Sequence, residues 1–171
     1  MNIFVTHPDP HVSAKVLPDK HVVKRPLETC QMLSIVFSHW YYDWGDDLVK
    51  KKDGTAYKTS KGAFSSHPCT IWANVSLTNT WWLLKHGLAL CAEYTHRYGK
   101  VHSCEKTLDE ASSIIPFSVP TTPTHFTRAM PDEYKHDTSI DTFTAYKNYI
   151  GSKPWAASNY LRDPSRKPDW L

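Results

Sequence analysis

Residues 16–33 combine a carboxylate, Glu28, with several groups that carry or can take a positive charge. These groups are Lys20, His21, Lys24 and Arg25. In a helix, side chains three or four positions apart are neighbours, so Lys24 and Glu28 would lie side by side. A carboxylate in such surroundings can stabilise a developing positive charge or transfer a proton, and the cations can hold phosphates. A solvated helix face with a weak Lys24–Glu28 pair explains the same residue types, so the cluster alone does not decide between the two interpretations.

The segment also has the apolar spacing of a helix with one buried face. From the pair Val22 and Val23 onward, its apolar residues recur every three or four positions, at Leu27, Cys30, Leu33 and Phe37. The pattern predicts a helix that runs to about Ser38 and carries its charged residues on or beside the solvent face. Pro26 either kinks this helix or opens a new one at its first turn.

Length and composition predict one globular domain over residues 1–171. The chain is 40% hydrophobic and 22% charged, and at 171 residues it can bury most of its apolar surface. The net charge of +3 is small, so any preference for nucleic acid has to come from local patches. Twelve prolines, concentrated toward the C-terminal half, predict long ordered loops there.

Several classes of protein are disfavoured by the sequence. The four cysteines form no CxxC pair and are expected to be buried thiols in a reducing compartment. The ten histidines form no HExxH motif or zinc-like cluster, so we expect no metal and no cofactor. The start of the chain is unlike a signal peptide, and no apolar run reaches the roughly 18 residues of a membrane span. We therefore expect a cytoplasmic protein that does not bind membranes.

The longest helix is predicted over about 30 residues, from His67 to Tyr98. Ser66 is the expected N-cap and Gly99 the expected C-terminal stop. A break is possible near residues 78–80. Its length makes this the central core helix.

Shorter elements complete a mainly α, compact helical bundle around that long helix. Asn2–Thr6 is an apolar extended segment that can thread between helices into the core and so fix the first residue. Thr107 and Glu110 have the spacing of a capping box. A proline-rich loop follows over residues 116–131, and a further helix is predicted over residues 138–150.

Two stretches interleave lysines or arginines with aromatic residues, a composition that neutralises phosphates and stacks bases. The first, residues 39–62, includes Lys51 and Lys52 beside a hairpin or loop at Asp53–Gly54. The second is a C-terminal arm over about residues 146–171. A solvated loop explains the composition of the first stretch equally well, and an arm packed over the bundle explains that of the second.

The chain resembles the phage pyrimidine-dimer DNA glycosylases of the endonuclease V type and their small bacterial relatives in three places. Asp19-x-His21, followed by Glu28 seven residues after the histidine, is similar to the family's Asp-x-His and catalytic glutamate. Residues 67–72, HPCTIW, are similar to the start of the family's long helix. Residues 145–151, AYKNYIG, are similar to an aromatic tail that contacts DNA. No one of these motifs is specific alone, and their order and spacing carry the resemblance.

The resemblance implies a DNA N-glycosylase that acts on damaged or modified pyrimidines, with the N-terminus tucked between helices beside Glu28. An α-amine ordinarily has a pKa of about 8, and cationic surroundings would leave a neutral fraction near pH 7. A neutral amine, of Met1 or of Asn2, could displace a base from C1′ of deoxyribose and form a Schiff base, which is the basis of AP-lyase activity. Glu28 would stabilise the oxocarbenium-like state and transfer protons during β-elimination. His21 is expected among the catalytic residues, and with Lys24 and Arg25 it would hold the flanking phosphates.

The expected partner is double-stranded DNA with a damaged or modified base, bound by a monomer in the bacterial host of a phage. The expected DNA contacts are Lys20, Lys24, Arg25, His67, Tyr146, Lys147, Tyr149, Lys51 and Lys52. Because the target carbon lies inside the duplex, the base must flip or the backbone must kink. Two alternatives stay open: a non-catalytic nucleic-acid-binding protein, and a transferase that modifies a base or nucleotide in the same pocket.

Overall fold

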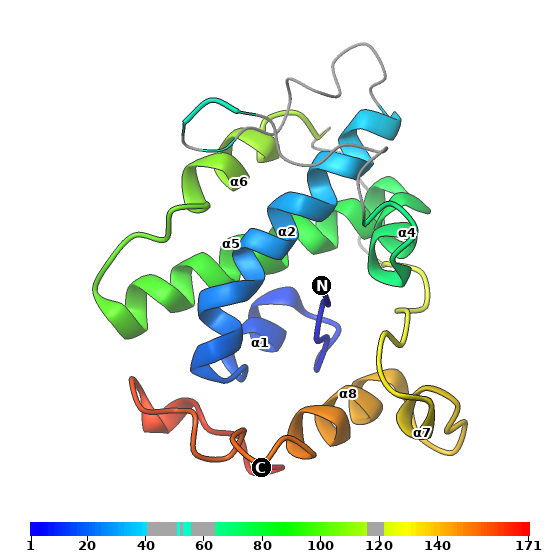
Figure 1. Cartoon of the computed structure of the whole chain (residues 1–171), viewed down its shortest axis with the longest axis vertical. Coiled ribbons are helices and arrows are strands. Elements are labelled where there is room, and N and C mark those ends of the chain that lie inside the picture. Colours follow the sequence, from blue (N-terminus) through cyan, green and yellow to red (C-terminus); the bar gives the residue numbers. More distant parts are fainter. Residues whose placement is uncertain (41–50, 52, 56–63, 116–121) are drawn as a thin grey trace.

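The regular elements of the computed structural model are all helices in the part of the chain that it describes, residues 1–40, 51, 53–55, 64–115 and 122–171 (Figure 1). They are α1 (Pro10–Lys15), α2 (Asp19–Trp40), α4 (Pro68–Asn74), α5 (Leu77–Tyr98), α6 (Glu105–Ser112), α7 (Asp132–Lys135), α8 (Thr142–Gly151) and the 3-10 helix η1 (Pro164–Arg166). The mainly α bundle is confirmed. None of the described helices is long and apolar enough to cross a membrane.

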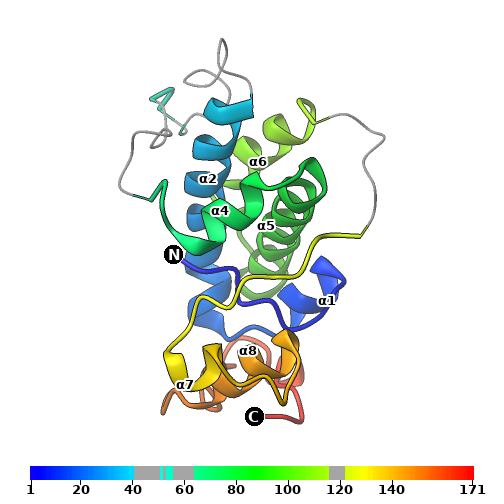
Figure 2. The ribbon, with the colours of Figure 1, turned by 90° about the vertical axis from the view of Figure 1, so that its right-hand side faces the viewer.

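The long helices α2 and α5 form the centre of the bundle. Helix α5 packs against α1, α2, α4 and α6, as expected for the central helix (Figure 2). Gly87 of α5 permits the close approach of α2, because a Cβ atom at this position would lie 2.6 Å from Cγ2 of Thr29. The core between them is filled by apolar residues such as Leu33 and Leu84, both completely buried.

The first residues of the chain thread into the core, as the sequence predicted. Ile3, Phe4 and Val5 are buried, with 1%, 4% and 0% of their surface exposed. Figure 1 shows the N-terminus in the middle of the molecule, with α2, α4 and α8 around it. The start of the chain is therefore fixed by packing.

The predicted orientation of α2 is partly wrong. Val23 and Leu27, expected in the core, are 43% and 42% exposed, whereas His21 and Glu28, expected at the solvent face, are 3% and 4% exposed. The reason is that the N-terminal segment packs on the face of α2 that carries these polar residues. Pro26 lies within α2 and does not divide it.

The helix predicted from His67 to Tyr98 is divided into α4 and α5 at Val75 and Ser76, slightly before the expected break. The N-cap of α4 is His67 and not Ser66, because the His67 ring accepts the N–H of Cys69 at 3.1 Å. Gly99 ends α5 with a left-handed φ of 64°, as predicted. The stop signal was correct because only glycine adopts this conformation without strain.

Two shorter predictions need correction. Thr107 lies inside α6, which begins at Glu105, so it does not cap that helix. Helix α8 begins at Thr142 and not near residue 138, because the Asp141 carboxylate accepts the N–H of Thr144 and caps the helix there. Of the loop between α6 and α7, residues 122–131 run across the bundle beside the N-terminal segment (Figure 2), and residues 116–121 lie outside the described residues.

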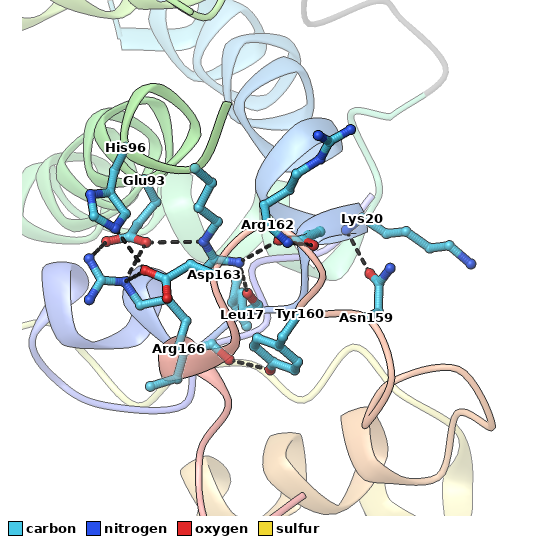
Figure 3. A network of polar contacts seen from close by, with 12 residues as sticks. Leu17, Lys20, Glu93, His96, Asn159, Tyr160, Arg162, Asp163 and Arg166 are labelled. Atoms are coloured by element: carbon cyan, nitrogen blue, oxygen red, sulfur yellow. Dashed lines mark hydrogen bonds and ion pairs between the residues drawn. The ribbon is translucent and has the colours of Figure 1, made fainter. Parts of the chain in front are cut away.

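The start of the predicted C-terminal arm belongs to α8, so the arm proper is residues 152–171. It is attached to the start of α2 and the end of α5 by a polar network (Figure 3). Buried Arg97 of α5 donates to the carbonyl of Leu17 at 2.8 Å and to Oδ1 of Asp19 at 3.1 Å. The Tyr160 hydroxyl donates to the carbonyl of Val16 at 2.6 Å. Arg166 of the arm pairs with Glu93, which also pairs with Arg97. The arm is therefore packed on the bundle, which is one of the two interpretations of its basic and aromatic composition; contact with nucleic acid is the other.

Candidate active site

The carboxylate of Glu28 is the centre of a cluster that includes the start of the chain. Its Oε1 lies 3.7 Å from the α-amino nitrogen of Met1 and 3.6 Å from Nζ of Lys24. Its Oε2 accepts the backbone N–H of Asn2 at 3.0 Å and a hydrogen bond from the Arg25 guanidinium. The predicted proximity of the chain's first residue to Glu28 is confirmed.

Side-chain contacts of Met1 and Asn2 hold the start of the chain in place. The Met1 side chain is 1% exposed, and its sulfur accepts a hydrogen bond from the Thr70 hydroxyl at 3.5 Å. The Asn2 side chain accepts the N–H of Phe4 at 2.9 Å and donates to the carbonyl of Ala129. The amine of Met1 is thus positioned by contacts to α2, α4 and the loop before α7.

Phe4 turns the chain behind the cluster. Its φ of 44° is unusual for a residue with a side chain and costs about 1–3 kcal/mol. The ring stacks on His21 with centroids 4.1 Å apart and on Tyr149 with centroids 5.8 Å apart, and the Arg25 guanidinium lies 4.7 Å from its centre. These ring contacts compensate for the strained backbone and hold the turn.

His21 has a different position from the one expected. Burial, followed by the charges of Arg25, Lys153 and Lys24, lowers the pKa of His21 to about 3. The ring is therefore uncharged at neutral pH, and it lies between Phe4 and Trp155. The expectation that His21 holds a phosphate is wrong, because only 3% of the residue is exposed. It supports the Phe4 turn instead.

The two cations next to Glu28 differ in exposure. The Arg25 side chain is 12% exposed and engaged with the carboxylate, whereas the Lys24 side chain is 65% exposed. Burial lowers the pKa of Arg25, and the charge of Glu28 opposes that shift. Arg25 is therefore bound within the site, and Lys24 is the cation that remains accessible to a ligand.

His67 lies close to the same charges. Burial and the charge of the amino terminus lower the pKa of His67, and Glu28 acts in the opposite direction. Its Nδ1 accepts the N–H of Cys69, so in the neutral ring the proton is on Nε2. The predicted DNA contact His67 therefore stands beside the amine as a neutral hydrogen-bond donor.

The aromatic residues of α8 do not all reach the surface. Tyr146 is completely buried, and its hydroxyl donates to the carbonyl of Thr127 at 2.9 Å and accepts the N–H of Ala129 at 3.2 Å. The prediction that Tyr146 contacts DNA is wrong, because it has no exposed surface. It fixes the loop whose Ala129 carbonyl holds Asn2. Lys147 and Tyr149 are partly exposed.

The remaining predicted DNA contacts are separated in space. Lys20 is exposed, with Nζ 4.6 Å from the centre of the Trp155 ring. Lys51 lines a small hollow of about 250 Å³ with residues of the α5–α6 turn and of α6, such as Val101 and Lys106, so it is not part of the Glu28 cluster. Lys52 lies outside the described residues.

Sequence reasoning missed three contributors to the site, and it misassigned Asp19 as well as His21 and Tyr146. Thr70 and the Ala129 carbonyl hold the first two residues, and the charge of Lys153 helps to lower the pKa of His21. A backbone carbonyl leaves no signal in a sequence, so Ala129 could not have been found. Asp19, which the resemblance pairs with His21, binds Arg97 and the N–H of Arg162 and anchors the arm instead.

No group of three or more histidine, cysteine or carboxylate side chains is arranged to hold a metal ion in the described part of the chain. All four cysteines are buried, and none forms a disulfide.

The model of one protein family, described as pyrimidine dimer DNA glycosylase, matches residues 1–106. No curated protein and no solved structure matches. The matched range contains Met1, Lys24, Glu28 and His67, and it ends before α8 and the C-terminal arm.

Proposed function

Because the chain belongs to the pyrimidine dimer DNA glycosylase family, we propose that it excises damaged or modified pyrimidines from double-stranded DNA and cleaves the abasic site with the α-amine of Met1. The observation that supports this proposal is the position of that amine, 3.7 Å from the buried carboxylate of Glu28. The buried Met1 side chain favours Met1 over Asn2 as the source of the amine, because removal of Met1 would leave its packing site empty.

In the first step the neutral amine attacks C1′ of the deoxyribose. The N–C1′ bond forms while the glycosidic bond breaks, and the base leaves with the electron pair of that bond and takes a proton from solvent. Positive charge develops at C1′ and O4′, and the Glu28 carboxylate stabilises it. Opening of the sugar ring, with proton transfer to O4′, gives a protonated Schiff base between Met1 and C1′.

In the second step the Schiff base makes the C2′ proton acidic, and Glu28 accepts this proton. The released electrons form the C2′–C3′ double bond and expel the 3′ phosphate, which cleaves the strand. Water then hydrolyses the imine and restores the amine. One carboxylate therefore serves both steps, and this requires it to remain within reach of the amine and of the sugar.

The DNA has to be held and deformed around this site. Flipping a nucleotide costs a few kcal/mol, which contacts between cations and phosphates can offset. Lys20 and Lys24 on α2 are exposed, and Lys147 on α8 is partly exposed. These side chains are the proposed phosphate contacts, and the neutral His67 is the proposed hydrogen-bond donor next to the sugar.

The test is trapping of the Schiff base with borohydride on a duplex that contains an abasic site. Two amines lie almost equally close to Oε1 of Glu28, Met1 N at 3.7 Å and Lys24 Nζ at 3.6 Å, so both have to be examined. We expect an adduct that maps by mass spectrometry to residue 1, survives Lys24→Gln, and disappears when the α-amine is converted selectively to a ketone by transamination.

Equal trapping after transamination, with the adduct on residue 24, would transfer the nucleophile to Lys24. Salt-sensitive binding of the same duplex with no adduct and no strand scission would leave only a nucleic-acid-binding protein. Either result would overturn the proposed mechanism.

A further inference from the structure

A groove of about 470 Å³ lies between the first turns of α2 and the C-terminal arm, next to the exposed Lys24. Helix α2 contributes one wall, and Asn159, Leu161 and Arg162 of the arm contribute the other. Tyr98 at the end of α5 also lines the groove. The arm lies outside the range matched by the family model. The groove is therefore a feature that the family match does not supply.

The rim of this arm groove is positively charged. Lys20, Lys24 and Arg162 line it, and Figure 3 shows Lys20 and Arg162 extending away from the polar network that anchors the arm. The only carboxylate among its lining residues is Asp19, whose two oxygens already bind the Arg97 guanidinium and the N–H of Arg162. The charge that remains available to a ligand is cationic.

The walls of the arm groove are mainly apolar. Val23 is 43% exposed and Leu161 is 79% exposed, and both line it together with the Tyr98 ring, which has the Arg162 guanidinium 5.0 Å from its centre. A single exposed apolar side chain needs no explanation, but two beside an aromatic ring in one concavity indicate a binding surface.

We propose that the arm groove binds one unpaired nucleotide, which lies next to the excision site in the DNA strand. This inference rests on the proposed function. The base would lie against Val23 and Leu161, because the Tyr98 ring already stacks on Tyr94 with centroids 4.6 Å apart and has the Arg162 guanidinium over it. The phosphates would lie near Lys20, Lys24 and Arg162. In paired DNA the faces of the bases are stacked on one another, so none of them is available to an apolar groove. An unstacked base with its phosphates has both kinds of surface, as in other single-strand sites that combine aromatic rings with cations.

The experiment measures binding to two duplexes with a tetrahydrofuran abasic analogue, one fully paired and one with an unpaired thymidine beside the analogue. The analogue has no aldehyde and forms no Schiff base, so the measurement does not depend on catalysis. The parent protein should bind the duplex with the unpaired thymidine about five- to tenfold more tightly. Leu161→Ala and Arg162→Gln should remove that preference, and the matched control Lys167→Gln, an exposed cation of the same arm outside the groove, should keep it.

Direct contact can be mapped by replacing the unpaired thymidine with 5-iododeoxyuridine and irradiating the complex. A crosslink to Tyr98 or to residues 159–162 supports the proposal. A crosslink elsewhere, or an equal loss in Leu161→Ala and Lys167→Gln, would overturn it. Competition by free thymidine monophosphate as effective as that by the DNA would also overturn it, since the groove would then be a nucleotide site. If trapping at Met1 fails while the Tyr98 crosslink forms, the proposed function is wrong and the arm groove still binds an unpaired nucleotide.

Discussion

One added glycine in front of Met1 should slow Schiff-base formation at least about 100-fold and leave the fold nearly unchanged. A chain encoded as Met-Gly-Met-Asn loses its first methionine because glycine is small, and it then begins with the added glycine. The Met1 nitrogen becomes an amide, and the new amine lies up to about 3.8 Å from the original position. The only free α-amine of the chain is then displaced from the carboxylate of Glu28.

The size of the effect follows from the geometry. A misplacement of about 1 Å can cost roughly 100-fold in rate, so a shift of a whole residue should reduce trapping at least that much, about 2.7 kcal/mol in the barrier. The contacts of Asn2 with Glu28, Phe4 and Ala129 do not involve the α-amine. They should therefore hold the segment as before.

The assay is single-turnover borohydride trapping on an abasic duplex, with thermal unfolding measured in parallel. The matched control carries one extra glycine after Leu171, and it should trap at the rate of the parent. Intact mass confirms which residue begins each chain. Trapping of the N-terminally extended chain at the parental rate would refute the assignment of the nucleophile to the first residue, and a large fall in its melting temperature would show that the segment had lost its place.

Three further changes test other parts of the argument. Glu28→Gln should lower the rate of strand scission at an abasic site by about 10²–10⁴-fold. It should also lower the melting temperature, because buried Arg25 loses its charged partner. Scission at the parental rate in a single-turnover assay would contradict the role of Glu28. The pKa of His21 is lowered to about 3 in the folded chain. Between pH 6.5 and about 3 the unfolded chain therefore takes up a proton at this residue and the folded chain does not. The contribution of His21 to the free energy of unfolding is complete above pH 6.5 and declines as the pH falls. His21→Phe keeps a ring against the turn and should make that decline shallower by up to about 1.4 kcal/mol per pH unit, and an unchanged slope in urea unfolding would show that His21 is protonated in the folded state. Gly87→Ala should destabilise the protein by about 1–3 kcal/mol, because the new Cβ would meet Thr29 Cγ2 at 2.6 Å; the added change Thr29→Ser removes that methyl and should restore part of the loss, and a failure of this rescue in urea unfolding would contradict the packing argument.

The outcomes at α2 show why a periodic pattern predicts a helix better than it predicts the buried face. The pattern identified the helix, but it placed Val23 in the core and His21 at the surface. Val23 in the core and His21 at the surface would be expected if α2 packed against the bundle with one face only. In the folded chain α2 contacts α4, α5 and α6 and also receives the N-terminal segment, and a pattern that spans one segment contains no information about a distant one.

The cluster around Glu28 was predictable in its residue types and not in its division of roles. Lys24 and Arg25 were expected to act alike as cations beside DNA. The fold directs Arg25 inward to the carboxylate and to Phe4, and leaves Lys24 largely exposed. The difference arises because the N-terminal segment covers only one side of the helix.

The sequence by itself determined the helical class, the stop at Gly99 and the set of residues able to form an amine–carboxylate site, because these depend on local spacing and on the chemistry of single side chains. The resemblance to a known family predicted the first residue beside Glu28. Only the tertiary structure decided which contacts hold the Met1 amine there, that Tyr146 is a core residue, and that the arm completes a groove with α2. Those facts depend on contacts between residues far apart in the chain, such as Asn2 with Ala129 and Asp19 with Arg162. The free energy of such contacts comes from burial and hydrogen bonding in the folded chain, and no short stretch of sequence records them.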